Sequence, residues 1–145
     1  LKNVGINAIE QLINYREANG KFNSLRELFT NLDNKIFNKR QIENLIKSGS
    51  FDELHSNRAQ LFASVENLLK FSSIKNEEKN TLQFNLFSNL DIKDIDELKL
   101  VSNYENWNYN QRLTAEYESF GFYLSNHPLE EFEDILKICD IKSYR

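Results

Sequence analysis

The feature that most constrains the fold of this chain is a series of short amphipathic segments in its first half, each with its own start signal. Apolar residues recur there at three- and four-residue intervals, the spacing of one face of an α-helix. Three segments open with a capping pair, Ser or Asn followed three residues later by Glu or Gln: Asn7/Glu10, Ser24/Glu27 and Asn38/Gln41. Gly20 and Gly49 end the first and third segments. Because no strand-like alternation interrupts the series, the sequence predicts an all-α fold.

The apolar face of each predicted helix should point into a shared core. In the first half these residues are Ala8, Ile9, Leu12, Ile13, Leu25, Leu28, Phe29, Leu32, Ile42, Leu45 and Ile46. A fourth helix is predicted from about Asn57, with Leu61, Phe62, Val65, Leu68 and Leu69 inside. Two more are predicted near the end, from about Asn110 to Leu124 and from Pro128 to about Cys139. Their apolar faces are expected to pack together: Leu113, Tyr117, Phe120 and Leu124 on one, and Leu129, Phe132, Ile135 and Leu136 on the other.

Composition narrows the class of protein. Hydrophobic residues make up 40% of the 145 residues, enough for a packed core rather than a disordered chain. Cys139 is the single cysteine and cannot form an internal disulfide, which favours a reducing compartment and hence the cytoplasm. No apolar run approaches the length of a membrane span. The sequence starts at Leu1, immediately before the first predicted helix, so it is expected to be an internal piece of a longer protein. His55 and His127 lack a second ligand at metal-binding spacing, so no metal site is predicted.

The net charge of −4 is unevenly divided along the chain. Residues 1–61 carry nine Lys/Arg and seven Asp/Glu, whereas residues 62–145 carry nine and fifteen. Any polyanionic partner is therefore expected to meet the first half, although two ordinary solvated surfaces would explain the same numbers.

Two turns in the first half indicate a way of binding nucleic acid. In residues 1–6, Asn3 takes the place of a glycine because asparagine tolerates positive φ, and a helix N-terminus follows at once. Backbone N–H groups in that setting form an anion nest that fits a DNA phosphate without reading sequence. A second candidate is residues 48–51, with Lys47 and Arg58 near its ends. The alternative is that the glycines only cap helices.

The two turns give a definite set of predicted contacts. The predicted DNA-binding residues are Asn3, Val4, Gly5, Ile6, Asn7, Lys47, Ser48, Gly49, Ser50 and Arg58. Valine in place of Gly5 is expected to strain the first turn and weaken DNA binding.

A compact apolar stretch interrupts the polar middle of the chain at residues 83–87, Gln-Phe-Asn-Leu-Phe. No amphipathic helix surrounds it, so its rings either cover the domain's own core or dock into a pocket on another protein. Trp107, Tyr104 and Tyr109 follow in the same polar region. They could stack on bases, but are better explained as closing this region onto the helices.

Several of these stretches together resemble one family, the bacterial replicative DNA polymerase III alpha subunits. The resemblance is carried by residues 1–5, 22–25, 38–40, 45–52 and 57–59 in the first half, and by residues 116–129 near the end. It covers nearly the whole chain in order, and is weakest over residues 89–110. It implies tandem helix-hairpin-helix units that hold duplex DNA, followed by the approach to an oligonucleotide-binding-fold domain.

The resemblance also implies what this chain lacks and what its apolar stretch does. The family's catalytic carboxylates and their Mg²⁺ belong to the palm, so no catalytic residue and no cofactor are expected here. An internal motif of the family binds the sliding clamp, and Gln83, Phe84, Leu86 and Phe87 occupy its place. Double-stranded DNA, the sliding clamp and other polymerase domains and subunits are thus the expected partners.

Together these observations predict three parts. Residues 1–75 form a tandem helix-hairpin-helix region, residues 76–109 an irregular linker with the clamp-binding motif, and residues 110–145 a pair of helices. The expected function is to grip duplex DNA and tether a DNA-directed DNA polymerase to its clamp. The alternative is a free-standing helical interaction module without DNA binding.

Overall fold

A computed structural model describes residues 1–33, 35–81 and 97–139, and within them the chain is helical without strands. This confirms the all-α prediction. The helices are α1 (Ile6–Asn19), α2 (Leu25–Asn31), α3 (Lys39–Lys47), α4 (Arg58–Ala63), α5 (Val65–Thr81), α6 (Tyr109–Phe120) and α7 (Glu133–Ile138), with a short 3-10 helix, η2 (Glu130–Phe132), before α7. No helix among these residues is both long enough and apolar enough to cross a membrane.

Most of the predicted start signals operate as helix caps. The Asn38 side chain accepts from the Gln41 backbone N–H at 3.0 Å while the Gln41 side chain accepts from the Asn38 N–H, a complete capping box for α3. Ser24 caps α2 and Asn57 caps α4 in the same way, each through one bond. The predicted Asn7 cap is wrong, because α1 already begins at Ile6.

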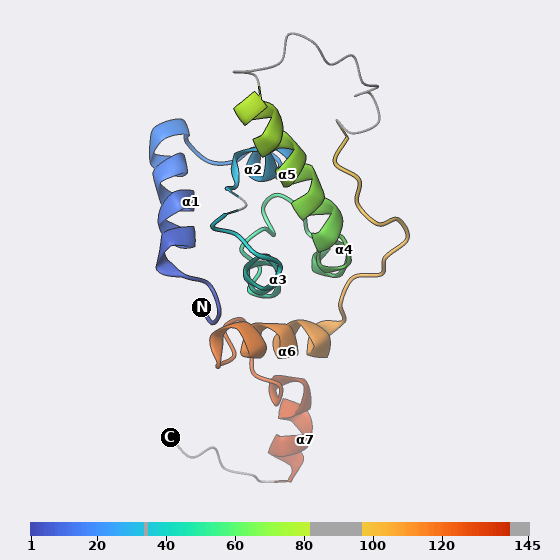
Figure 1. Ribbon diagram of the computed structural model, residues 1–145. Coiled ribbons are helices and arrows are strands. Elements are labelled where there is room, and N and C mark those ends of the chain that lie inside the picture. Colours follow the sequence, from blue (N-terminus) through green and yellow to red (C-terminus); the bar gives the residue numbers. More distant parts are fainter. Residues whose placement is uncertain (34, 82–96, 140–145) are drawn as a thin grey trace.

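Helices α2 to α5 enclose the core (Figure 1). The largest side chains that are fully buried there are Phe29, Leu28, Leu32, Ile42, Ile46, Leu61 and Leu68. The apolar residues predicted to face inward on α2 and α3 are all buried, as the helical spacing requires. Helix α1 is the exception, since only Ala8 is buried in it and Ile13 is 45% exposed.

The predicted fourth helix is two helices that meet at Ser64. Its buried hydroxyl donates to the Gln60 carbonyl at 2.7 Å and accepts from the Val101 N–H at 2.9 Å. This side chain therefore binds a second segment of the chain at the point where α4 ends and α5 begins. The apolar spacing continues across the break, so periodicity alone does not reveal it.

The described part of the predicted linker lies on the helices. Leu98 and Leu100 pack against the core, and Asn57 donates to the Tyr104 carbonyl at 2.8 Å. Trp107 contacts the ring of Phe62, with centroids 5.7 Å apart. This confirms that the tryptophan closes this region onto the helices.

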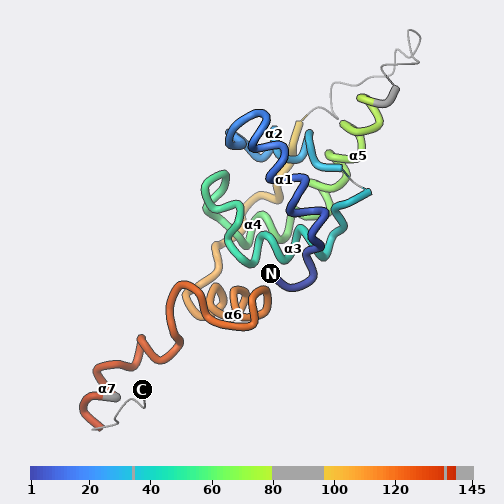
Figure 2. Tube along the Cα trace, turned by 90° about the vertical axis from the view of Figure 1, so that its left-hand side faces the viewer, coloured from blue at the N-terminus to red at the C-terminus, as the bar shows by residue number. Residues whose placement is uncertain are grey.

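The two C-terminal helices do not pack together as expected. Helix α6 lies on α3, whereas α7 contacts only η2 among the described elements and projects away from the body (Figure 2). Leu129, Phe132 and Ile135, predicted to be inside, are about half exposed. Helix α6 ends four residues early, at Phe120, because Gly121 adopts a left-handed conformation (φ 90°) that turns the chain away.

Candidate nucleic-acid interface

The turn before α1, residues 1–5, has the predicted left-handed residue at Asn3, with φ 58°. Gly5 is different, because its φ of −70° is extended backbone open to any residue. A Cβ there would meet only the Gln41 Nε2 at 3.7 Å, an ordinary contact. The backbone at Gly5 therefore does not require glycine, and the conformational demand in this turn lies on Asn3.

The N-terminus of α1 offers unsatisfied backbone donors. Gly5 is its N-cap, and no side chain makes a capping hydrogen bond there. The N–H groups of Ile6 and Asn7 belong to the first turn, where a helix has no carbonyl partner for them. Ile6 is 74% exposed, so this end of the helix is open to solvent. Such an end attracts anions through its amides and its dipole.

A second helix N-terminus lies beside the first. The turn before α3 includes Asp33 and residues 35–38. Its Phe37 is buried in the core, and its Asn38 caps the helix. Gly5 of the pre-α1 turn approaches the Gln41 side chain in the first turn of α3. Lys35, Lys39 and Arg40 are exposed at this end.

The apolar spacing of the sequence carries a signal for this pre-α3 turn. An offset of 33 residues places Ile9, Leu12 and Ile13 on Ile42, Leu45 and Ile46. The same offset pairs the caps, Gly5 with Asn38. The two turns thus precede helices with the same apolar spacing, with Asn38 at the position that corresponds to Gly5.

One of the positive charges at the N-terminus of α3, Lys39, already has an ionic partner. Lys39 forms an ion pair with Glu66 at 2.8 Å between two exposed side chains. The hydrogen bond to Glu66 raises the pKa of Lys39, and the same bond lowers the pKa of Glu66. Lys39 is thus charged but already paired.

The 48–51 turn, predicted as a second phosphate nest, lies at the opposite end of α3. The Gly49 N–H donates to the Ile46 carbonyl and the Ser50 N–H to the Leu45 carbonyl, at 3.0 and 3.1 Å, which is a Schellman motif. These amides are used inside the helix end, and a helix C-terminus carries negative dipole charge. The geometry therefore favours a capping role for Ser48, Gly49 and Ser50.

Arg58, predicted to contact DNA, lies beneath that turn and is 6% exposed. Its guanidinium bonds to Asp52 at 2.6 Å, to Glu116 at 3.2 Å and to the Lys47 carbonyl at 3.3 Å. The hydrogen bond to Asp52 is the largest cause of the raised pKa of Arg58, while burial acts in the opposite direction. Arg58 therefore ties the end of α3 to α6 and is not presented to a ligand.

Lys47 is also engaged by α6. Its ammonium lies 2.7 Å from the Glu118 carboxylate and 5.3 Å from the centre of the Phe62 ring. A phosphate at Lys47 would have to compete with Glu118.

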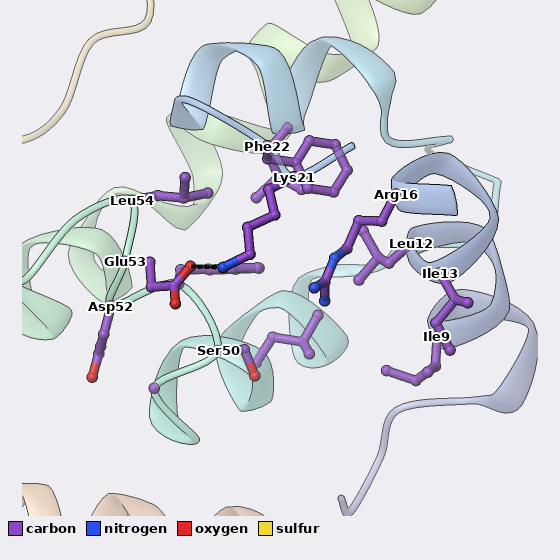
Figure 3. Close-up of a pocket in the computed structure, with 14 residues that line it drawn as sticks. Ile9, Leu12, Ile13, Arg16, Lys21, Phe22, Ser50, Asp52, Glu53 and Leu54 are labelled. Carbon is purple, nitrogen blue, oxygen red and sulfur yellow. Dashed lines mark ion pairs between the residues drawn. The ribbon is translucent and has the colours of Figure 1, made fainter. Parts of the chain in front are cut away.

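An open pocket of about 440 Å³ lies along one side of α1. Figure 3 shows Ile9, Leu12 and Ile13 of α1 on one side, with Phe22 and Leu54 on other walls. Lys21 and Glu53 form an exposed ion pair at 3.7 Å across it. Ile9 and Leu12 also pack against the core, and the Tyr15 hydroxyl of α1 donates to Glu27 of α2 at 3.1 Å.

Sequence comparison with known proteins concerns the same region. A helix-hairpin-helix motif matches residues 1–61, the part that contains both turns. DNA polymerase III subunit alpha of Rickettsia conorii is 36% identical over 141 residues, which cover 97% of this chain and 12% of that protein. The corresponding subunits of Borreliella burgdorferi and Caulobacter vibrioides are each 34% identical, over 92% and 94% of this chain.

The chain is homologous to a segment of DNA polymerase III alpha subunits. It spans about an eighth of the relatives' length, 12% in each of these three. The motif match covers α1 to α3 and the first part of α4, so both turns lie inside the helix-hairpin-helix match.

Two other predictions concern residues away from the turns. Gln83, Phe84, Leu86 and Phe87 lie outside the described residues. Among the described residues, no group of three His, Cys, Asp or Glu side chains could hold a metal ion.

Proposed function

We propose that this segment binds the backbone of duplex DNA through the pre-α1 and pre-α3 turns, as a non-catalytic part of a cytoplasmic replicative DNA polymerase. The catalytic carboxylates and the Mg²⁺ of such a polymerase would lie outside this segment. The observation that carries the proposal is the pair of adjoining helix N-termini, with Gly5 of one beside Gln41 of the other.

The chemistry of the two turns suits phosphate rather than base edges. First-turn amides and helix dipoles attract negative charge without reading sequence. Exposed Lys35 and Arg40 add mobile positive charge at the second N-terminus. A repeated pair of such turns can contact the backbone at two points, which gives orientation as well as affinity.

Duplex binding by this chain is expected to be weak, independent of sequence and sensitive to salt. With about two to four phosphates neutralised, log K should fall against log salt with a slope of about −2 to −4. Fluorescence anisotropy with two duplexes of unrelated sequence, over a series of salt concentrations, measures both properties. Absent or salt-insensitive binding would favour the alternative of a helical interaction module.

One substitution localises the contact. Arg40→Gln removes an exposed charge from the first turn of α3 and should weaken binding about three- to tenfold, with a salt slope shallower by about one. Lys137→Gln makes the same charge change on α7, where the ammonium pairs with Glu133 at 3.3 Å. An equal loss in both variants would show that net charge, and not this turn, governs binding.

We further propose that residues 83–87 tether the polymerase to its sliding clamp. Support comes from the residue pattern: Gln83 can anchor a polar rim, while Leu86 and Phe87 can fill an apolar pocket. Burying the two apolar side chains yields about 1.5–3 kcal/mol each, from which the cost of ordering the segment is subtracted. These two side chains alone correspond to an affinity of about millimolar or weaker, so the isolated contact is expected to be weak and to be strengthened when clamp and polymerase share one DNA molecule.

Removing the two apolar anchors is expected to abolish measurable clamp binding. Leu86→Ala/Phe87→Ala should lower affinity on the order of a hundredfold or more, given the burial energies of both side chains. Isothermal titration of the chain with the sliding clamp measures this. The matched control is Phe122→Ala/Leu124→Ala, which removes the same two residue types from exposed positions. Unchanged affinity in the first variant would refute the tether.

A further inference from the structure

Helix α6 holds the pre-α1 turn directly. The Lys2 N–H donates to the Ser119 carbonyl at 2.7 Å, near the C-terminus of α6. Gly121 follows, and the Lys2 side chain lies against it. A Cβ built on Gly121 would be 3.1 Å from the Lys2 Cε. Its ammonium lies 5.8 Å from the centre of the Tyr117 ring. The turn is therefore fastened to a helix that comes more than a hundred residues later.

The same helix is fastened to α3 by a buried charge. Glu116 lies one turn before Ser119, and its side chain is 3% exposed. One carboxylate oxygen accepts from Arg58 at 3.2 Å, and the other accepts from the Ser125 hydroxyl at 2.8 Å and the Ser125 N–H at 3.2 Å. Arg58 in turn binds the last helical carbonyl of α3, that of Lys47. Buried carboxylates are stabilised only when all such partners are in place.

The other contacts of the pre-α1 turn are the packing of Val4 against the core and the approach of Gly5 to the Gln41 side chain. One side of helix α1 lines a pocket, while Ala8 is buried and Ile9 and Leu12 pack against the core. At its N-terminus the ordinary contact between Gly5 and Gln41 leaves room for movement. Figure 1 shows α6 passing under both the N-terminus of the chain and α3.

We propose that Glu116 is a positioning residue for DNA binding. Through Arg58 it fixes α6 on α3, and α6 thereby holds the pre-α1 turn beside the N-terminus of α3. The spacing of the two turns is then set from outside the helix-hairpin-helix unit, by a helix beyond the clamp-binding segment. The functional half of this inference rests on the proposed duplex binding, whereas its structural half stands without DNA.

The experiment compares two variants with the same charge change on one helix. Glu116→Gln removes the buried carboxylate, and Glu118→Gln removes an exposed one that pairs with Lys47. In Glu116→Gln without DNA, exchange of the Lys2 amide by NMR should accelerate about tenfold or more. The Leu68 amide, bonded to the Ser64 carbonyl inside the core, should keep its rate. Glu118→Gln should leave both amides unchanged.

Duplex binding supplies the second measurement. Glu116→Gln should weaken binding about three- to tenfold although it makes the chain less negative, whereas Glu118→Gln should bind as well as the parent or better. Long-range electrostatics alone predicts tighter binding in both variants. Equal effects of the two variants would overturn the inference.

The outcomes separate this inference from the proposed function. Unchanged Lys2 exchange in Glu116→Gln overturns the positioning role whether or not the chain binds DNA. Faster exchange in a chain whose parent form does not bind duplex refutes the proposed function and leaves the structural role standing. If Glu116→Gln does not fold, Ser125→Ala removes one bond to the same carboxylate and should accelerate Lys2 exchange about twofold. No acceleration there counts against the inference.

Discussion

Replacing Gly49 by alanine is expected to lower the free energy of unfolding by about 3–5 kcal/mol, because the new methyl displaces a buried ion pair. A Cβ at Gly49 would overlap the Arg58 Nη2 and lie 2.9 Å from the Asp52 Oδ2. The guanidinium cannot retreat without leaving Glu116 buried and unpaired. The left-handed backbone at Gly49, φ 77°, adds about 1–2 kcal/mol of its own for any L side chain. Urea denaturation followed by circular dichroism measures the loss.

The control separates backbone conformation from the clash. Gly121→Ala also places a side chain at positive φ, 90°, after a helix. Its nearest neighbour is the flexible end of Lys2, at 3.1 Å, which can move. This variant should cost only about 1–2 kcal/mol, the conformational part. Equal costs at the two glycines would show that the Arg58 contact contributes nothing.

Replacing Arg58 by methionine is expected to lower the free energy of unfolding by about 3–5 kcal/mol, the usual cost of leaving a buried partner charged and unpaired. Glu116 is that partner, since Asp52 is 39% exposed at its side chain and can be solvated. Adding Glu116→Gln should therefore restore part of the loss. The measurement is a double-mutant cycle by urea denaturation.

An exposed ion pair supplies the comparison for Arg58. Lys39→Met breaks the pair with Glu66, whose side chains are 54% and 70% exposed. This variant is expected to leave the free energy of unfolding almost unchanged, because solvent screens such pairs. If Lys39→Met lowered the free energy of unfolding as much as Arg58→Met, burial would not explain the contribution of the Arg58 ion pair to stability.

Local signals in the sequence predicted the helices of the first half well. Asn38 and Gln41 form their capping box, and Gly20 follows the last residue of α1. These features depend on neighbours within four residues, so a single sequence contains them. The break at Ser64 depends on Val101, far along the chain, and could not be seen in the same way.

The candidate site was predicted in part. Asn3 and the open N-terminus of α1 follow from turn chemistry, whereas Arg58 was misplaced because its partner Glu116 is 58 residues away. A basic residue beside a glycine turn is equally compatible with a surface contact and a buried ion pair. The pre-α3 turn was missed because Asn38 hides the repeat of Gly5, although the apolar spacing preserves it. The α7 prediction failed because apolar spacing does not specify what the face packs against.

The bond between Lys2 and Ser119 has a consequence for the order of folding. The helices α2 to α5 can collapse through contacts made within the first part of the chain. The pre-α1 turn, in contrast, cannot form its bond to Ser119 until α6 is present. Closing so long a stretch of chain costs conformational entropy that short-range contacts do not have to overcome, so such contacts form late. During synthesis the core would therefore assemble first, and the two turns would reach their final spacing only after α6 has left the ribosome.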